Sequence, residues 1–540
     1  MKNKKAYLLT NSKSHKSHDG DMLYLNYLDY IRSNNQHAHY FFINNKAIDD
    51  MNIQSALAAN WFRDCGKDIF EDKFSMGLLM ERRFRFLFAN VFKYYFAYKY
   101  WIDKYDLIEL PDTMNQILSL VTKYYKNQSH SGATNQDFSK DEYFLNRAHI
   151  KSIKSKFFPT LLRTLQTLTR TDVSNKVLCF PDWTYNHITN EDFLYMNNKS
   201  LYKGFYFTPK KIEYTDEELS IEFKNKIKSN LYTVLSNSDL DEEDLNPLKS
   251  ILFEVLNYEY LNSIHEAKHL YVTIEDAINY YRPKAIVIPN KEYCWYQMIT
   301  QLTSERNIEL YVLIDGYLTY ADDYYFQRDR NDRDYLVKNY CAMGDYNIKL
   351  LDNFKNYINL HNVQTPLQEY NYSSSNTQEG YDAIILMPYP WTNSVNGLWD
   401  SRYRYLIDVI NVFRKLSIDN YAIKIKIGHD SDELEKVKMI TNADVLSGFF
   451  HESIQKCKLI VGTLGTSLVQ SILYDMPYYV YEPFYNGLSD KNFSNSIIKD
   501  SVVSRNIENL EYNISNSNPT ELNKSMIRGE ISLSEFYKSI

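Results

Sequence analysis

The chain has 540 residues, of which 44% are hydrophobic and 24% are charged. This composition is that of a globular protein, and it excludes a fibrous or globally disordered chain. The formal charge of −7, from 61 basic and 68 acidic residues, provides no general basic field for nucleic acid. At about 150 residues per domain, two large domains are the simplest organisation.

The cysteine pattern and the hydropathy of the chain favour a reducing cytoplasm. The five cysteines are scattered, and no two form a Cys-x-x-Cys pair: Cys65, Cys179, Cys294, Cys341 and Cys457. This pattern argues against a disulfide scaffold and against a cysteine-based zinc site. The apolar run at residues 6–9 is too short for a signal peptide, and no run of about 18 apolar residues exists, so we expect no transmembrane helix and a cytoplasmic location.

Strands and helices alternate through the first part of the chain. In chain order, the pattern predicts a strand at 5–10, helices at 21–32, 80–125 and 141–170, a strand at 176–180, helices within about 216–269, and strands at 284–289 and 309–314 separated by a helix that ends at 306. This alternation predicts a parallel α/β sheet.

A polar, glycine-terminated segment at residues 364–380 predicts an interdomain linker. It separates an N-terminal domain, residues 1–363, from a C-terminal domain, residues 381–510. The N-terminal domain is expected to be Rossmann-like and enlarged by helical insertions. A helical tail at residues 511–540 is expected to pack back on this first domain.

The C-terminal domain repeats the strand and helix alternation in a compact form. In chain order, the pattern predicts a strand at 382–387, a helix at 403–416, a strand at 421–427, a helix at 431–441, a strand at 458–461, a helix at 467–474 and a strand at 478–481. Such an array is typical of nucleotide-binding domains. The fold class predicted is therefore α/β, with two Rossmann-like domains facing a cleft, and ligands favour such a cleft at the carboxyl ends of the strands.

The clearest candidate site follows the strand at 458–461. The strand ends at Gly462, a Gly/Thr/Ser turn follows, and a helix begins near Ser467. Backbone N–H groups at a helix start, the hydroxyls beside them and glycines that allow close approach form a cradle for an anion. The predicted contacts are Gly462, Thr463, Gly465, Thr466 and Ser467. No lysine follows the second glycine, so the turn is not a Walker A loop; simple capping of the helix by Thr466 or Ser467 is the alternative interpretation.

Two further side chains follow predicted strands directly. The strand at 421–427 ends at Gly428 and places His429 at its tip, where an imidazole can donate to a phosphate that gains charge as it leaves. The strand at 309–314 continues into Asp315 and Gly316, where a carboxylate is placed for general base catalysis. A structural histidine and an ordinary Asp-Gly turn are the alternatives.

Together these features resemble the motifs of bacterial sialyltransferase-like and capsule-type GT-B glycosyltransferases. Those enzymes carry an acidic-acidic-Gly motif, a His-Pro motif and a Ser/Thr motif in this order. Asp315-Gly316 matches the last two positions of the first motif, His429 the histidine of the second, and Thr466-Ser467 the third.

The resemblance covers roughly residues 284–490, and it includes two departures. Ile314 stands in place of the first acid, and Asp430 in place of the proline. Related capsule enzymes that use other activated sugars share the C-terminal pattern, so the fold is the firmer part of the resemblance.

The resemblance implies an inverting, metal-independent transfer from a CMP-activated nonulosonate, of the sialic acid or Kdo type, to a hydroxyl of a bacterial surface glycan. Asp315 would be the general base. His429 and the helix start at Thr466 and Ser467 would stabilise the departing CMP phosphate, with Gly428 beside them. Glu482, after the strand at 478–481, would bind ribose hydroxyls. No cofactor is expected.

The acceptor, a glycan or glycolipid, is expected to lie on the N-terminal side of the cleft. Candidate contacts are His18, Asp19 and Asp21 in the first β-α loop, together with Gly316 and Tyr317. A GT-B transferase with an NDP-hexose or CDP-polyol donor is the alternative enzyme, with Lys424 and Lys426 as candidates for a second phosphate. A non-catalytic glycan-binding protein of the same fold is a third hypothesis.

Two competing signals point elsewhere. His265-Glu266-x-x-His269 matches the H-E-x-x-H signature of zinc proteases, but a third ligand is not evident. Residues 81–103 are basic and aromatic, which is compatible with a peripheral membrane face or with a buried helix whose basic ends reach solvent.

Overall fold

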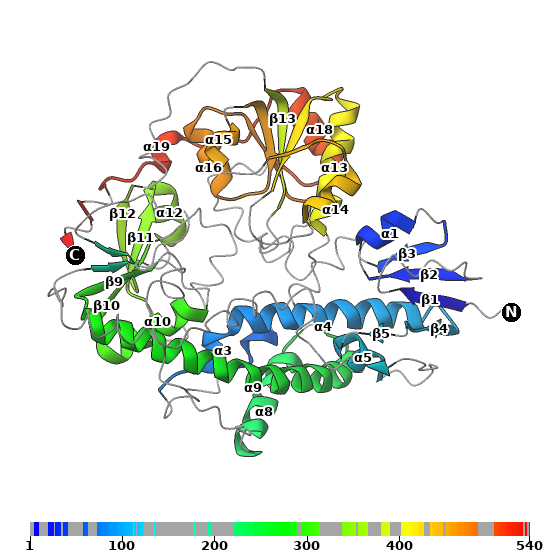
Figure 1. Cartoon of the computed structure of the whole chain (residues 1–540), viewed down its shortest axis with the longest axis horizontal. Coiled ribbons are helices and arrows are strands. Elements are labelled where there is room, and N and C mark those ends of the chain that lie inside the picture. Colours follow the sequence, from blue (N-terminus) through cyan, green and yellow to red (C-terminus); the bar gives the residue numbers. More distant parts are fainter. Residues whose placement is uncertain are drawn as a thin grey trace, which may run out of the picture.

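The computed structural model contains, in its described part, three large parallel β-sheets, a two-stranded parallel sheet formed by β5 (Thr113–Met114) and β6 (Ala133–Thr134), and the helices that connect them (Figure 1). It describes residues 5–9, 20–25, 27–33, 36–41, 54, 58–62, 68, 73–111, 113–114, 116–123, 133–134, 177–179, 193–195, 221–238, 240–288, 294–313, 337–352, 355–364, 380–388, 401–425, 433–446, 450–454, 456–483, 502–532, 535–536 and 539–540. The predicted mixed α/β class with parallel sheets is confirmed.

The first sheet has four strands in the order β3-β2-β1-β4. They are β1 (Lys5–Leu9), β2 (Asp21–Tyr24), β3 (Ala38–Tyr40) and β4 (Leu107–Glu109), and α1 (Tyr27–Ser33) lies between β2 and β3. The prediction of a helix from residue 21 is wrong at its start. Met22, Leu23 and Tyr24 are buried in succession and pair with β1, so this stretch is a strand, and the helix begins at Tyr27.

The second sheet has six strands in the order β12-β11-β10-β9-β7-β8. They are β7 (Val177–Cys179), β8 (Phe193–Tyr195), β9 (Ala285–Ile288), β10 (Glu309–Leu313), β11 (Asn339–Met343) and β12 (Asn359–Val363). The strands predicted at 176–180, 284–289 and 309–314 are confirmed as β7, β9 and β10.

The third sheet has six strands in the order β15-β14-β13-β16-β17-β18. They are β13 (Tyr381–Leu386), β14 (Tyr421–Lys424), β15 (Asp444–Leu446), β16 (Cys457–Gly462), β17 (Tyr478–Tyr481) and β18 (Val503–Ser504). Counted along the chain this is the order 3-2-1-4-5-6, which is that of doubly wound dinucleotide-binding sheets. Helices cover both faces, with α13 (Ser401–Lys415) and α18 (Ile507–Ser515) on one side and α15 (Phe450–Ile454) and α16 (Thr466–Leu473) on the other (Figure 1).

Two long helices, α4 (Glu81–Ile102) and α9 (Glu242–Tyr281), connect the first two sheets (Figure 1). The 40 residues of α9 span about 60 Å at 1.5 Å per residue. The helix ends at Arg282, whose left-handed φ of 45° is followed by Pro283. Apart from the two-stranded β5-β6 sheet, the described strands of residues 1–363 therefore form two separate sheets at opposite ends of these helices, where the sequence suggested one enlarged unit. The predicted domain boundaries stay predictions.

The remaining described elements are short and complete the connections. They are η3 (Ala59–Phe62), α3 (Met76–Leu79), β5 (Thr113–Met114), α5 (Gln116–Lys123), β6 (Ala133–Thr134), α8 (Ile221–Ser236), α10 (Cys294–Arg306), α12 (Gly344–Leu351), α14 (Glu433–Ile440) and α19 (Lys524–Ile527).

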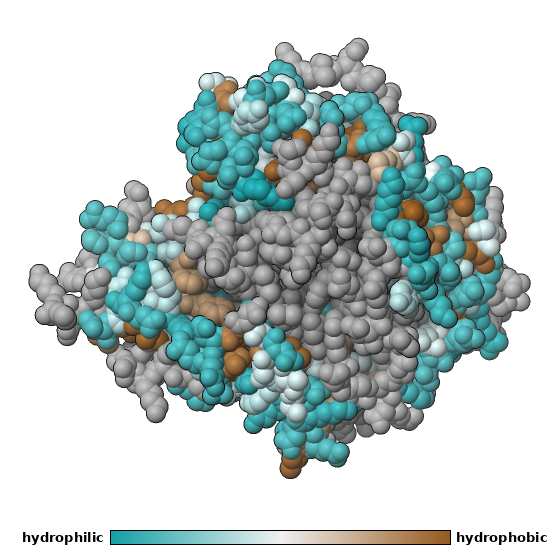
Figure 2. Space-filling model, turned by 180° about the vertical axis from the view of Figure 1, so that it is seen from behind, coloured by the Kyte–Doolittle hydropathy of each residue, from teal (hydrophilic) through white to brown (hydrophobic). Residues whose placement is uncertain are grey.

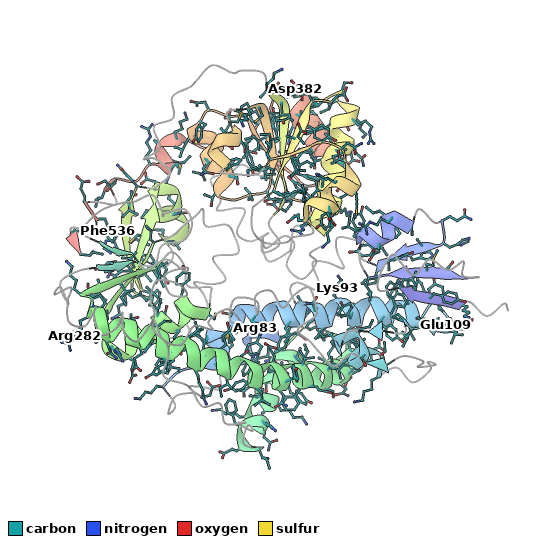
Figure 3. The ribbon with its side chains drawn as sticks, in the orientation of Figure 1. Arg83, Lys93, Glu109, Arg282, Asp382 and Phe536 are labelled. Carbon is teal, nitrogen blue, oxygen red and sulfur yellow. The ribbon has the colours of Figure 1, made fainter. Side chains whose placement is uncertain are left out.

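The C-terminal tail packs on the second sheet. Gln364 donates its backbone N–H to the carbonyl of Ile531 at 2.8 Å, and Val363 and Ile531 form a parallel bridge at the edge of β12. The ring of Phe536 lies 5.6 Å from that of Tyr311 and 5.4 Å from that of His361 (Figure 3). The tail thus joins the third sheet to the second.

Among the described residues, no helix is both long and apolar enough to span a lipid bilayer. Hydrophobic residues on the face shown in Figure 2 are scattered in small patches between hydrophilic ones. Scattered patches of this kind are ordinary for a globular surface.

Candidate functional site

The strand order of the third sheet identifies the edge where a sheet of this topology would bind a ligand. From β13 the chain proceeds outward to β14 and β15, and from β16 it proceeds in the opposite direction to β17 and β18. The carboxyl ends of the neighbouring strands β13 and β16 therefore flank a topological switch point, where doubly wound sheets bind ligands. The Gly/Thr/Ser turn predicted to bind an anion follows β16 at this point.

Tyr478 packs against the start of the turn and holds it. Its hydroxyl donates a hydrogen bond to the carbonyl of Thr463 at 2.7 Å, and burial, followed by the charge of Glu482, raises the pKa of Tyr478 well above its ordinary value. A Cβ atom at Gly462 would lie 2.0 Å from this hydroxyl. Gly462 therefore makes room for Tyr478, whereas the sequence suggested room for a ligand.

Glu482 fixes the middle of the same turn. It follows β17, is 2% exposed, and accepts a hydrogen bond from the backbone N–H of Leu464 at 2.7 Å. The carboxylate thus supports the turn from the neighbouring strand. The ribose contact predicted for Glu482 stays a prediction, and the structure assigns its Oε1 to the backbone.

The helix start itself is open. Gly465 is the N-cap of α16 and no side chain caps the helix. Thr466 and Ser467 occupy its first two positions, they are partly exposed, and neither hydroxyl makes a hydrogen bond within the described part of the chain. A Cβ atom added to Gly465 would meet no atom within 4 Å.

This geometry suits an anion. The first N–H groups of a helix have no partner inside the helix, and the helix dipole places partial positive charge there. Two free hydroxyls and open space at Gly465 complete the cradle. Capping by Thr466 or Ser467, the alternative interpretation, is not observed.

A buried ion pair braces the other helices at this edge. Arg402, in the first turn of α13, lies 2.9 Å from Glu433 in the first turn of α14, and their side chains are 2% and 7% exposed. The guanidinium also donates to the hydroxyl of Tyr403 at 3.0 Å. Sequence patterning did not reveal the pair, because nothing in either helix start indicates that the two will meet.

Of the predicted site residues, the five that follow β10 and β14 lie outside the described residues: Asp315, Gly316, Tyr317, Gly428 and His429. The last described residue of β10 is Leu313, two positions before Asp315, and the chain is described as far as Ile425 after β14. The predicted approach of Asp315 to His429 stays a prediction.

The predicted acceptor contacts divide in the same way. His18 and Asp19 lie outside the described residues, whereas Asp21 is the first residue of β2. The predicted location of Asp21 in a loop is therefore corrected: it stands at the amino edge of its sheet. There it accepts a hydrogen bond from the Tyr105 hydroxyl at 2.9 Å, and two histidines flank it.

The H-E-x-x-H match lies on α9, with its central carboxylate already engaged. Arg83 of α4 lies 2.6 Å from Glu266 and 2.6 Å from Glu259 (Figure 3). A zinc protease needs this glutamate as a base, whereas here a guanidinium holds it. The imidazoles of His265 and His269 lie outside the described side chains.

The basic segment at residues 81–103 is α4, and its described charges face the protein. Arg83 pairs with α9, Lys99 lies 2.6 Å from Glu243 and 2.7 Å from Asp244, and Lys93 is 4% exposed. For these three residues the buried-helix interpretation holds and the membrane-face interpretation does not. The side chains of Arg82 and Arg85 lie outside the described set.

Comparison with known proteins returned no matching family model and no significantly similar curated sequence.

Proposed function

We propose that the protein is a glycosyltransferase that transfers a nonulosonate of the sialic acid or Kdo type from a CMP-activated donor to a hydroxyl of a bacterial surface glycan. The observation that supports it most is the open start of α16 at the switch point of a 3-2-1-4-5-6 sheet. A single phosphate fits the first-turn N–H groups and the hydroxyls of Thr466 and Ser467.

The charges described at this edge favour a donor with one phosphate. Lys424, the described candidate for a second phosphate, is 7% exposed, and its ammonium approaches the carbonyl of Ile425 at 3.4 Å. A lysine whose ammonium is buried in the protein does not bind the second phosphate of a donor at the carboxyl edge of the sheet. An NDP-hexose or CDP-polyol donor therefore needs Lys426 or a contact from elsewhere.

The proposed arrangement is of the GT-B type, in which the carboxyl edges of the second and third sheets face one cleft. In this arrangement Asp315 follows β10 and takes the proton of the acceptor hydroxyl, so that the oxygen attacks the anomeric carbon as the CMP phosphate leaves. His429 follows β14 and, with the start of α16, stabilises the phosphate charge that develops. Inversion follows from the single displacement.

The proposal is tested by a thermal-shift screen with CMP, CDP, UDP and GDP. A ligand present at about 100 times its dissociation constant stabilises the folded state by roughly 2.7 kcal/mol. We expect a shift with CMP that is lost in His429→Ala. Asp315→Asn should retain the CMP shift and lose donor turnover. A melting-temperature shift with UDP or GDP alone would contradict the proposal of a CMP-activated donor. If no nucleotide shifts the melting temperature, a non-catalytic glycan-binding protein is favoured.

A further inference from the structure

The last residues of the chain cover one face of the second sheet at its β12 edge. Gly529 lies against the end of β12, where an added Cβ atom would meet the carbonyl of Val363 at 1.9 Å. Ile531 then forms a parallel bridge to Val363, and Phe536, which is 2% exposed, follows a few residues later (Figure 3). The described residues of 531–540 therefore form a strap on this face, the tail strap.

The strand register decides which side chains lie beneath the tail strap. Cys341 of β11 pairs with Leu313 of β10 and with His361 of β12 in the parallel ladders. Tyr311, two positions before Leu313, therefore projects to the same face of the sheet as His361. The next residue of β12, Asn362, donates to a carboxylate of α12 on the opposite face.

The ring of Phe536 covers His361. It lies 5.4 Å from the imidazole and 5.6 Å from the ring of Tyr311, and the ring of Tyr311 lies 5.7 Å from the imidazole. Within this cluster of three rings, Nε2 of His361 is buried and makes no hydrogen bond to any described residue. A buried polar atom without a partner is rare in folded proteins and requires an explanation.

Burial disfavours the charged form of this imidazole. It lowers the pKa of His361 below 6.5, because a protonated ring would hold a charge and two N–H donors away from water. No described carboxylate forms an ion pair with the ring. Glu309 of β10 accepts the hydroxyl of Tyr311 at 3.0 Å, Glu535 accepts from the backbone and a hydroxyl of the tail strap itself, and Cys341 adds a buried thiol to this face.

We propose that the tail strap is a pH-sensitive element, which docks on the second sheet while His361 is neutral and is released when His361 takes up a proton. Release moves Phe536 away, so that water can solvate both N–H groups of the imidazolium. A free imidazole titrates near pH 6.5. Docking is therefore at full strength above about pH 7, and it weakens as the pH falls through about 6.5 towards the lower pKa of the docked state.

The contact between the second and third sheets does not depend on this imidazole. Ile527 of α19 belongs to the core of the third sheet, and an added Cβ atom at Gly344, the start of α12, would meet the carbonyl of Ile527 at 2.6 Å. We therefore expect both sheets to stay folded when the tail strap is released. Release uncovers the rings of Tyr311 and His361, which makes this face accessible in acid alone. The switch does not depend on the proposed donor chemistry.

The test is hydrogen–deuterium exchange of the full chain at about pH 7.5 and about pH 5.5, measured by mass spectrometry and corrected for the intrinsic effect of pH on exchange. We expect the protection of peptides from residues 531–540 to fall by up to about 10-fold, which is the limit for a group with a free pKa of about 6.5. Peptides from β16 provide the internal reference and should keep their protection.

Variants of His361 separate this switch from other effects of pH. His361→Leu and His361→Gln lack a titrating ring, so the tail strap should be equally protected at both pH values. His37→Gln removes an exposed histidine of the first sheet and is the matched control, in which the fall in protection should persist. Phe536→Ala should reduce the protection of the tail strap already at about pH 7.5.

Three results would overturn the proposal. They are a protection of the tail strap that does not fall in the unaltered chain, the same fall in His361→Leu as in the unaltered chain, and a Phe536→Ala tail strap that is as protected as that of the unaltered chain.

Discussion

The carboxylate of Glu482 accepts a hydrogen bond from the backbone N–H of Leu464 at 2.7 Å, and this contact joins the end of β17 to the turn that follows β16. Tyr478, in the same strand, holds the carbonyl of the preceding residue, Thr463, at 2.7 Å. One strand therefore fixes both sides of the turn. The free donors of the turn are left at its far end, where Thr466 and Ser467 begin α16.

Two substitutions of Glu482 distinguish the effect of its hydrogen bond to the turn from the effect of its charge. Glu482→Leu removes the acceptor and leaves the N–H of Leu464 without it, which costs about 1–3 kcal/mol. Glu482→Gln keeps an acceptor oxygen and should restore most of this loss. Calorimetry should show that the melting temperature decreases from the unaltered chain to Glu482→Gln and then to Glu482→Leu. Equal melting temperatures for Glu482→Leu and the unaltered chain would show that the contact does not stabilise the turn.

The two glycines of the turn should respond differently to alanine. At Gly462 a Cβ atom meets the Tyr478 hydroxyl at 2.0 Å, so Gly462→Ala should destabilise the protein by about 1–3 kcal/mol. At Gly465 the Cβ atom meets nothing, so Gly465→Ala should leave the melting temperature nearly unchanged. If an anion binds at the helix start, however, Gly465→Ala should reduce stabilisation by CMP. A stable Gly462→Ala protein, or a Gly465→Ala protein that melts early, would contradict this geometry.

Removing one partner of the Arg402–Glu433 pair should destabilise the protein more than replacing both partners with apolar residues. Arg402→Met removes the guanidinium that lies 2.9 Å from the buried carboxylate of Glu433 and should cost about 3–5 kcal/mol. The double variant Arg402→Met/Glu433→Leu should regain much of that stability, because both buried charges are removed together. A double-mutant cycle in chemical denaturation measures the coupling, and a double variant less stable than Arg402→Met would refute it.

Asp68 provides a test of pH dependence. Burial raises its pKa from 3.8 to about 6, against hydrogen bonds from the N–H of Met76 and the hydroxyl of Tyr260, each at 2.7 Å. Between about pH 4 and pH 6 the folded chain keeps a proton that the unfolded chain has released. The stabilising effect of this group is therefore complete below about pH 4 and is lost as the pH rises through 6.

Asp68→Asn removes this titration. The melting temperature of Asp68→Asn relative to that of the unaltered chain should rise between about pH 4 and pH 6, because only the unaltered chain has to ionise a buried carboxyl group over this range. A difference that stays constant over this range would show that Asp68 does not titrate in it.

Periodicity predicted the C-terminal domain well. The strands at 382–387, 421–427, 458–461 and 478–481 correspond to β13, β14, β16 and β17, because each is a short apolar run bounded by polar turns. The turn after β16 could be predicted as a helix start because Gly, Thr and Ser residues separate the apolar strand from the helix pattern that follows. The strand β15 (Asp444–Leu446) was missed, since its three residues are partly or fully exposed and carry no apolar run.

Pairings across the chain could not be predicted. Nothing in the sequence shows that Tyr478 would fill the space at Gly462, or that Asp21 would meet His37 and His39, because both depend on which strands become neighbours. The division of the N-terminal strands into two sheets is of the same kind. Periodicity identifies strands, whereas long-range packing decides the sheet to which each belongs.

Titration calorimetry of CMP into the full chain tests whether the start of α16 binds the phosphate of CMP. We expect one CMP site in the unaltered protein and an affinity at least about 10-fold weaker in Thr466→Ala/Ser467→Ala. We expect no change in Ser525→Ala, which alters an exposed serine in the first turn of another helix. Absence of CMP binding by the unaltered protein, or equal affinity in the double variant, would contradict phosphate binding at the start of α16.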